Sequence, residues 1–165
     1  MGTSRTLAVQ ELLISAHRLV YTSEASSPQG IDEGWNQRTI LGHLGDVDEQ
    51  VWLARIDLMV KASRLKNAPP AFAWWEPDPV ETARKYTHYS HAEVVAKLLS
   101  TRSAIVEKLN SLKEQDWEAT AIHATFGEID IVRCVALILA HDDEHSTSIE
   151  KVRLGNGEIN PGRPE

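Results

Sequence analysis

The fold is most readily predicted from residues 130–152, DIVRCVALILAHDDEHSTSIEKV. Its apolar positions recur at intervals of three and four, which predicts an α-helix with one face turned toward a core. Asp130 is placed to cap the start of this helix, and Gly155 and Gly157 are placed to end it. The expected inward positions include two imidazoles among apolar and small polar side chains: Cys134, Ile138, His141, His145 and Ser148.

Three earlier segments share this periodicity. Thr6 to Ser23 predicts a first helix, and Asn36 to about Arg64 predicts a second. A third begins at the Ser-x-x-Glu capping box of Ser90 and Glu93 and runs to about Lys113. No stretch shows a convincing period of two. The sequence therefore predicts an all-α fold, a four-helix bundle.

The connections differ in length. Turn residues from Ser26 to Gly30 separate the first two helices. Pro69 to Tyr89 holds four prolines and several aromatic residues without a sustained period, so we expect a long ordered crossover between helices two and three. Two interpretations of Trp74 and Trp75 stay open: they wall the mouth of a pocket, or they pack on the bundle or at a contact between two copies.

Length and charge exclude several classes of protein. The 165 residues fit one domain spanning 1–165. The formal net charge of −7 disfavours nucleic acid and anionic membrane surfaces as partners. No apolar run approaches the roughly 20 residues of a membrane span, and the single cysteine, Cys134, cannot form an internal disulfide. We therefore expect a cytoplasmic protein that binds neither nucleic acid nor membrane.

Three histidines form a candidate metal site. His141 and His145 lie one helical turn apart on one face, a spacing that a single ion can bridge. His43 follows Ile40 by three positions and precedes Val47 by four, which places it on the buried stripe of helix two. Three neutral imidazoles with an open coordination position match a catalytic zinc site. The alternative is that each is a core histidine hydrogen-bonded to a carbonyl group, and the HxxxH spacing also occurs by chance.

Other polar residues near these histidines have weaker signals. Gln50 and Ser148 are expected to face inward near the metal, where either could orient a bound water or substrate or simply pack. Cys134 lies about 10 Å along the axis from His141, so a buried structural role is expected. Asp142 and Glu144 flank the site and are expected to be solvated or interhelical charges. Surface or capping roles are expected for the remaining histidines, His17, His88, His91 and His123.

Four short motifs, in order along the chain, resemble landmarks of the DinB/YfiT-like superfamily, which is unrelated to the DNA polymerase that shares the DinB name. They are WNQRTILGHL (35–44), EQDW (114–117), HATFGEI (123–129) and ILAHDDEH (138–145). The resemblance spans roughly Leu7 to Arg153. It implies a four-helix bundle with an up-up-down-down-like crossover, and a divalent metal held by His43, His141 and His145. Zinc, nickel, iron and manganese all remain open.

The resemblance also implies two functions. Characterised members include isomerases and S-transferases that use the low-molecular-weight thiols mycothiol or bacillithiol, and the iron-dependent DinB-type domain of ergothioneine-pathway sulfoxide synthases. The synthases continue the last motif as HxxxHxE, whereas Thr147 stands at the Glu position here, so that chemistry is discounted. We expect a thiol S-transferase or isomerase acting on a small-molecule substrate, because a three-histidine ion can bind a thiol as thiolate or activate water.

The competing hypothesis is a non-catalytic, stress-related bundle in which the ion only braces the helices. A site closed by four protein ligands would favour it, because catalysis needs an exchangeable position. The sequence offers three clear ligands and no clear fourth. A homodimer also remains open.

Overall fold

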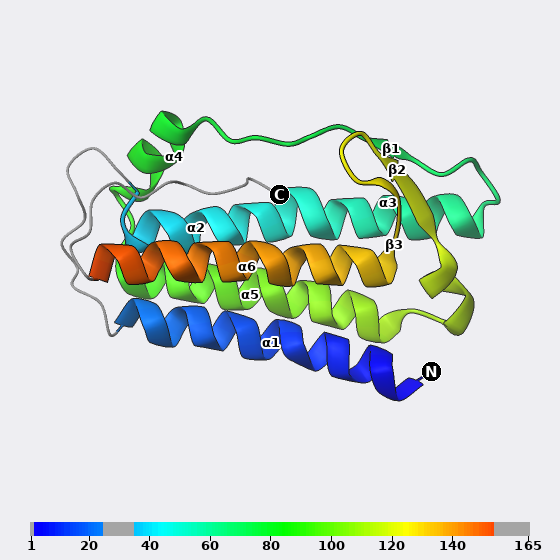
Figure 1. Cartoon of the computed structure of the whole chain (residues 1–165), viewed down its shortest axis with the longest axis horizontal. Coiled ribbons are helices and arrows are strands. Elements are labelled where there is room, and N and C mark those ends of the chain that lie inside the picture. The colour runs from blue at the N-terminus through cyan, green and yellow to red at the C-terminus, as the bar shows by residue number, and fades with distance from the viewer. Residues whose placement is uncertain (1, 25–34, 154–165) are drawn as a thin grey trace.

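The computed structural model describes residues 2–24 and 35–153, and long helices dominate it (Figure 1). They are α1 (Gly2–Glu24), α2 (Gln37–Val47) with its continuation α3 (Ala54–Arg64), α5 (His91–Ser111) and α6 (Ile131–Arg153). The predicted all-α four-helix bundle is thus confirmed, with each helix close to its expected range. The turn expected from Ser26 to Gly30 and the terminating Gly155 and Gly157 lie outside the described residues.

The four helices enclose one core. α1 packs against α5 and α6, and α2 also packs against α5 and α6, so α1 lies diagonally from α2. α2 and α5 run in the same direction, antiparallel to α1 and α6 (Figure 1). The order of directions is therefore down-up-up-down rather than up-up-down-down. The long crossover is needed because α3 ends at one end of the bundle and α5, which runs in the same direction, begins at the other (Figure 1).

The second helix contains a feature that its sequence period did not predict. Asn36 caps the start of this helix, because its side-chain oxygen accepts a hydrogen bond from the Thr39 amide at 2.9 Å. Between α2 and α3 the helix widens into a π-helical segment, η1 (Asp48–Leu53). Such segments interrupt α-helices frequently at functional sites. This one lies a little over one turn after His43.

The crossover is more regular than expected. It contains a two-residue strand, β1 (Ala71–Phe72), and a helix, α4 (Pro79–Tyr86). Asp78 caps α4 by accepting from the Glu81 amide at 2.9 Å, and Pro79 occupies the first turn. Asp followed by Pro and then Glu is a start signal for a helix. The predicted long ordered crossover is present, but the sequence did not predict α4 because only two turns follow that signal, too few to show a period.

The prediction that the chain lacks strands was also wrong. β1 pairs in parallel with β2 (Thr120–His123), which pairs antiparallel with β3 (Gly127–Asp130). Gly127 has a φ of 72° at the turn of this hairpin, a conformation that glycine adopts without strain. A short 3-10 helix, η2 (Glu114–Glu118), leads into the hairpin from α5. Strands of two and four residues are too short to give a recognisable alternation.

Two hydrophobic clusters form the core, and a layer of polar side chains divides them. Along α6 one cluster ends at Ile138, the other includes Ile149, and His141, Asp142 and His145 lie buried between. Ser15 on α1 and Arg102 on α5 separate the same two clusters on their helices. The candidate chemistry therefore lies in the middle of the bundle. None of the helices described has the length and apolarity needed to cross a membrane.

Candidate metal centre

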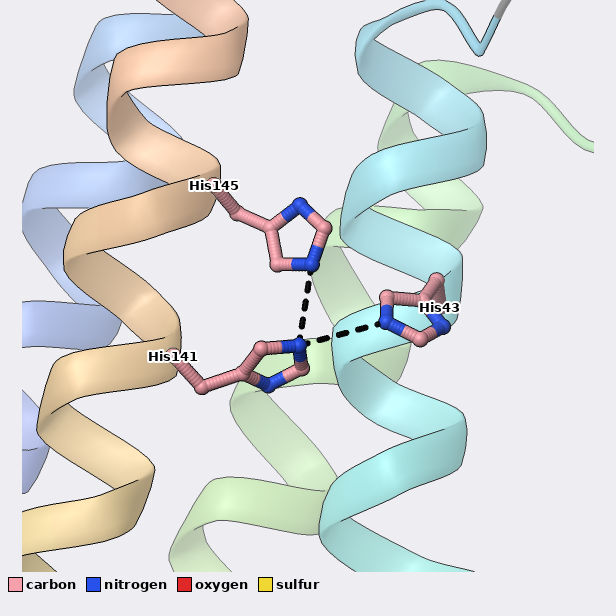
Figure 2. Close-up of side chains that lie close together, drawn as sticks. All are labelled: His43, His141 and His145. Atoms are coloured by element: carbon pink, nitrogen blue, oxygen red, sulfur yellow. Dashed lines mark hydrogen bonds between the residues drawn. The ribbon is translucent and has the colours of Figure 1, made fainter. Parts of the chain in front are cut away.

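Three imidazoles from two helices meet in the polar layer (Figure 2). The Nε2 atom of His141 lies 2.9 Å from Nε2 of His145 and 3.4 Å from Nε2 of His43. All three side chains are buried, and one nitrogen of each lies within 4.8 Å of the others. α6 supplies two of them one turn apart, as its sequence predicted, and α2 brings the third from 98 positions away. The bundle therefore brings together the three residues proposed as metal ligands.

The spacing of these nitrogens fits a metal ion. A tetrahedral zinc ion bound to imidazole at about 2.0–2.1 Å holds its nitrogens about 3.3 Å apart, close to both Nε2 separations. Burial lowers the pKa of His43 to about 3, helped by the neighbouring His145 and opposed by Asp46. Burial, with His141 nearby, also lowers the pKa of His145. His43 and His145 are therefore neutral, the form that ligates metals.

The outer nitrogens of two of these rings have no partner among the described residues. They are Nδ1 of His43 and Nδ1 of His145, both buried. In metal sites the outer ring nitrogen is normally a donor to a carboxylate, carbonyl or water. Both rings thus direct their inner nitrogens at the shared centre, and their outer nitrogens are buried without a hydrogen-bond partner among the described residues.

Two tryptophans wall the imidazoles. The ring of Trp35 lies 4.7 Å from that of His43 and 6.3 Å from that of His145, measured between centroids, and Trp75 lies 6.3 Å from His43. The indole nitrogen of Trp35 donates to the carbonyl oxygen of Pro79 at 2.9 Å, which fastens the start of α4 beside the site. The sequence identified Trp35 only as part of a motif and left the place of Trp75 open. Trp75 belongs to the wall.

A pocket of about 320 Å³ opens beside the cluster between α2, the crossover and α4. His43, Gln50 and Trp75 line it, together with Asp46 of α2 and with acidic, basic and other side chains of the crossover and α4. Gln50 is exposed rather than turned into the core, and it reaches the site through this pocket. Because His43 belongs to both the cluster and the pocket wall, a small molecule bound in the pocket would lie next to a ligand.

Asp46, on α2, connects that helix to α4 and α5. Its carboxylate accepts from Lys97 at 2.6 Å, from Tyr86 at 2.7 Å and from Lys85 at 3.0 Å. Burial alone would raise the pKa of Asp46, but these hydrogen bonds outweigh it and hold the pKa below its ordinary value. The ring of Tyr86 also packs directly on Gly42, where a Cβ atom would lie 2.3 Å from it. The residue before His43 must therefore be glycine for α4 to pack this closely.

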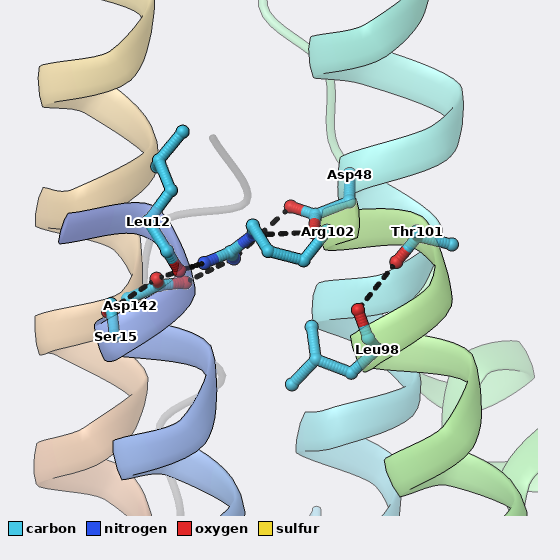
Figure 3. A network of polar contacts seen from close by, with 7 residues as sticks. All are labelled: Leu12, Ser15, Asp48, Leu98, Thr101, Arg102 and Asp142. Atoms are coloured by element: carbon cyan, nitrogen blue, oxygen red, sulfur yellow. Dashed lines mark hydrogen bonds and ion pairs between the residues drawn. The ribbon is translucent and has the colours of Figure 1, made fainter. Parts of the chain in front are cut away.

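The same polar layer contains a buried ionic network (Figure 3). The guanidinium of Arg102 on α5 donates to Asp142 at 2.8 and 2.9 Å, to Asp48 at 2.8 Å and to the Leu12 carbonyl at 2.9 Å. Ser15 on α1 donates to Asp142 at 2.6 Å. Asp142 directly follows His141, and Asp48 lies in η1. Arg102 thus joins the two helices that carry the imidazoles, a role that the sequence alone did not reveal.

The other predicted neighbours have separate roles. Asp142 is an interhelical charge, whereas Glu144 is exposed. Ser148 is buried and donates to the Glu144 carbonyl within its own helix at 3.2 Å. Cys134 is buried beside Met59, with 3.8 Å between their sulfurs, and burial raises the pKa of its thiol to about 12. The chain's only thiol is therefore protonated and packed in the core.

Of the four remaining histidines, His123 does not lie where the sequence predicted it. His17 and His88 are exposed, and His91 Nε2 lies 2.9 Å from the Ser23 hydroxyl. His123, expected at the surface or in a cap, is instead buried at the end of β2. Its Nδ1 accepts from the amides of Thr125 and Phe126, and Trp74 packs against its ring. The hairpin buries this side chain, so its position could not be read without the strands.

Comparison with known proteins agrees with this architecture. The sequence model of the DinB superfamily matches residues 10–149. Among solved structures, YfiT from Bacillus subtilis, described as a probable metal-dependent hydrolase with an unusual four-helix bundle topology, superposes with a TM-score of 0.72. The alignment covers 95% of this chain and 91% of YfiT at 18% identity, so the likeness shows the fold alone. No curated protein sequence matches the chain.

Proposed function

The chain belongs to the DinB superfamily, and from this premise we propose that it binds one divalent metal ion through His43, His141 and His145. We further propose that it uses the ion as an enzyme of the thiol S-transferase or isomerase type. The observation that carries the proposal is the convergence of three buried imidazole nitrogens beside a pocket that shares His43. Zinc, nickel, iron and manganese are the candidate ions.

The chemistry supplied by such an ion is a lowered pKa of a thiol or water in its remaining coordination position. The chain's own residues bind the ion and orient the groups around it. His43, His141 and His145 hold the ion as neutral ligands, while Trp35 and Trp75 fix the rings and limit access of water to the side of the pocket. The pocket, about 320 Å³ in volume, has room for a small substrate.

The proposed reaction takes its thiol from solution. The sulfur of a low-molecular-weight thiol forms a bond to an electrophilic carbon, the thiol proton passes to solvent, and the leaving group departs with its electron pair. Cys134 cannot supply this sulfur, because burial holds its thiol in the protonated form away from the imidazoles. We also propose a cytoplasmic location, because the reaction needs a low-molecular-weight thiol from the surrounding solution.

A second candidate function is hydrolysis. It is favoured by the likeness to YfiT, which is described as a probable metal-dependent hydrolase. The same ligands and pocket would serve it, with water in place of the thiol. The two functions differ in a measurable way, since only the transferase needs an added thiol.

The test is a paired assay of metal-free and metal-loaded protein. Each form is incubated with a chromogenic electrophile and with mycothiol, bacillithiol or glutathione, and in parallel with chromogenic esters and amides lacking a thiol. We expect a metal-dependent rate in the first set. Such a rate in the second set alone would assign a hydrolase, and no metal-dependent rate in either would favour the non-catalytic bundle.

Matched variants separate the site from the rest of the chain. Cys134→Ala should retain the rate, since its thiol takes no part. His141→Ala should lose it. If Cys134→Ala were inactive while still binding metal and folding, the thiol would come from the protein and the proposed reaction would be wrong.

A further inference from the structure

Gln50 lies on the wall of the pocket, although its spacing from His43 predicts a place in the core. In an unbroken α-helix the side chains at positions 43 and 50 project within about 20° of each other, so Gln50 would point into the bundle as His43 does. Gln50 is instead exposed, and it lines the pocket of about 320 Å³ beside the imidazoles. Its position therefore has a local cause.

That cause is the π-helical segment η1, which contains Gln50. A π-helical turn takes about one residue more than an α-helical turn, so each residue advances by about 80° rather than 100°. Over the three steps from Val47 to Gln50 the difference adds up to about 60°. Gln50 thus turns away from the direction of His43 and comes within about 20° of the direction of Asp46, which also lines the pocket.

Buried contacts hold the wide turn in place on both sides of Gln50. Its first residue, Asp48, accepts from Arg102 at 2.8 Å in the polar layer (Figure 3). Two later residues, Val51 and Trp52, are buried in the hydrophobic core. The packing of the helix therefore directs Gln50 to the pocket without any contact made by the Gln50 side chain itself.

Most other polar side chains of the pocket wall are engaged within the fold. Asp46 accepts from three donors, one of which is Lys85 at 3.0 Å. Glu81 forms an ion pair within α4. The Asp78 carboxylate accepts from the Glu81 amide at 2.9 Å, and the Thr82 hydroxyl donates to the Asp78 carbonyl at 2.7 Å. These groups already have partners before any ligand enters.

The Gln50 carboxamide is open to the pocket and has no hydrogen-bond partner among the described residues. The Nδ1 atom of His43 also lacks a partner, but it is completely buried and is not reached from the pocket. A carboxamide offers an N–H donor and a carbonyl acceptor side by side, and it carries no charge. A second primary carboxamide satisfies both at once, because it presents an acceptor and a donor with the same spacing.

We propose that Gln50 is a positioning residue that binds a primary carboxamide group of a small substrate, with the apolar part of the substrate against Trp75. A few placed polar groups beside an aromatic wall are the usual means by which a pocket orients its ligand. The inference rests on the proposed function, since it places the substrate in the pocket that shares the metal ligand His43. It adds the substrate class, an uncharged carboxamide.

Two probes of nearly equal shape test the proposal: hydrocinnamamide, which carries a primary carboxamide, and benzylacetone, in which a methyl group replaces the NH2 group. Their binding is followed by NMR of the protein with and without added zinc. Fragments of this size bind at millimolar concentrations. We expect the amide to bind about fivefold more tightly than the ketone, the contribution of one hydrogen bond. The amide should also shift the side-chain NH2 resonances of Gln50, which are identified by their loss in Gln50→Leu.

The variants separate Gln50 from the rest of the pocket. Gln50→Leu keeps a similar size but removes both polar groups, so it should bind the two probes equally, and circular dichroism should show an unchanged fold. The matched control is Gln10→Leu, since Gln10 is exposed on α1 and does not line the pocket; it should keep the fivefold preference. Absence of binding of either probe at millimolar concentration, equal binding of both to the wild type, unshifted Gln50 resonances, or a preference that survives in Gln50→Leu would each overturn the proposal.

These outcomes are separate from those of the rate assay, because neither probe contains a thiol. If the preference for the amide depends on Gln50 but no metal-dependent rate appears, the carboxamide site stands and the proposed reaction is wrong. If a metal-dependent rate appears and the wild type shows no preference for the amide, the inference about Gln50 alone is wrong.

Discussion

At the scale of single residues, the proposed metal centre depends on three imidazoles that no neighbour replaces. Removing any one leaves two ligands, so His43→Ala, His141→Ala and His145→Ala should each reduce bound metal from one ion per chain to a small fraction. The measurement is elemental analysis of untagged protein after dialysis. His88→Ala is the control, because His88 is exposed and distant in sequence from all three. Full stoichiometry and affinity in His43→Ala would show that the third ligand is misassigned.

A single carboxyl group, Asp48, should give the metal-free protein a characteristic pH dependence. Burial raises its pKa from 3.8 to about 6, although Arg102 opposes the rise. Between pH 4 and pH 6 the native state therefore holds a proton that the unfolded state has released, and stability falls as pH rises. The loss is on the order of 3 kcal/mol once pH exceeds 6.

Urea denaturation of wild type and Asp48→Asn from pH 4 to pH 7 measures this. The asparagine cannot titrate, and all other groups are shared, so the difference between the two curves isolates Asp48. The variant should gain stability relative to the wild type as pH rises. A relative gain by the wild type would mean that Arg102 outweighs burial and holds the carboxyl pKa low.

At the scale of helices, Arg102 connects α5 to α6 and to η1 through two buried carboxylates. Arg102→Met fills a similar volume but leaves Asp48 and Asp142 without their cation, which should destabilise the fold by about 3–5 kcal/mol. The triple change Arg102→Met, Asp48→Asn and Asp142→Asn removes the charges together and should recover a large part of this loss. Denaturant midpoints decide it. If the triple variant is no more stable than Arg102→Met, the loss of stability comes from altered packing rather than from unpaired charge.

The helices could be predicted from sequence because each buries a long periodic face, and the starts of α5 and α6 are also marked by the capping residues Ser90 and Asp130. The Ser90 and Glu93 capping box is present as expected, with hydrogen bonds of 3.1 and 2.7 Å. Elements without enough length could not be predicted: α4 has eight residues and β1 has two. The π-helical segment was also hidden, since one extra residue in a turn leaves both flanking apolar stripes intact.

The site was predictable in part for a similar reason. His43, His141 and His145 occupy inward positions of periodic helices, so their burial followed from spacing. Trp35 and Arg102 lie close to the site only because of how helices and crossover pack, which one sequence does not specify. His123 was misplaced because its burial depends on a hairpin whose strands have four residues each.

At the scale of the whole molecule, the imidazoles lie between two hydrophobic clusters, so a bound ion should stabilise the entire bundle. An ion that binds only the native state adds about 2.7 kcal/mol at a hundredfold excess over its Kd. Chelation should therefore lower the Tm by several degrees in a thermal scan, and readdition of metal should restore it. The control is His141→Ala, whose Tm should not respond to chelator. An unchanged wild-type Tm after proven removal of metal would contradict a site in the core.

The 98 positions between His43 and His141 also set when the protein can acquire its ion. Ribosomes add about 5–20 residues per second, so roughly 5–20 s of synthesis separate the first ligand from the second. During that interval the growing chain offers only one imidazole ligand to the site. A single imidazole binds an ion too weakly to retain it. Metal can therefore be loaded only after α6 has been synthesised and has docked against α2. The ion that enters is then decided by what the surrounding compartment holds free at that moment.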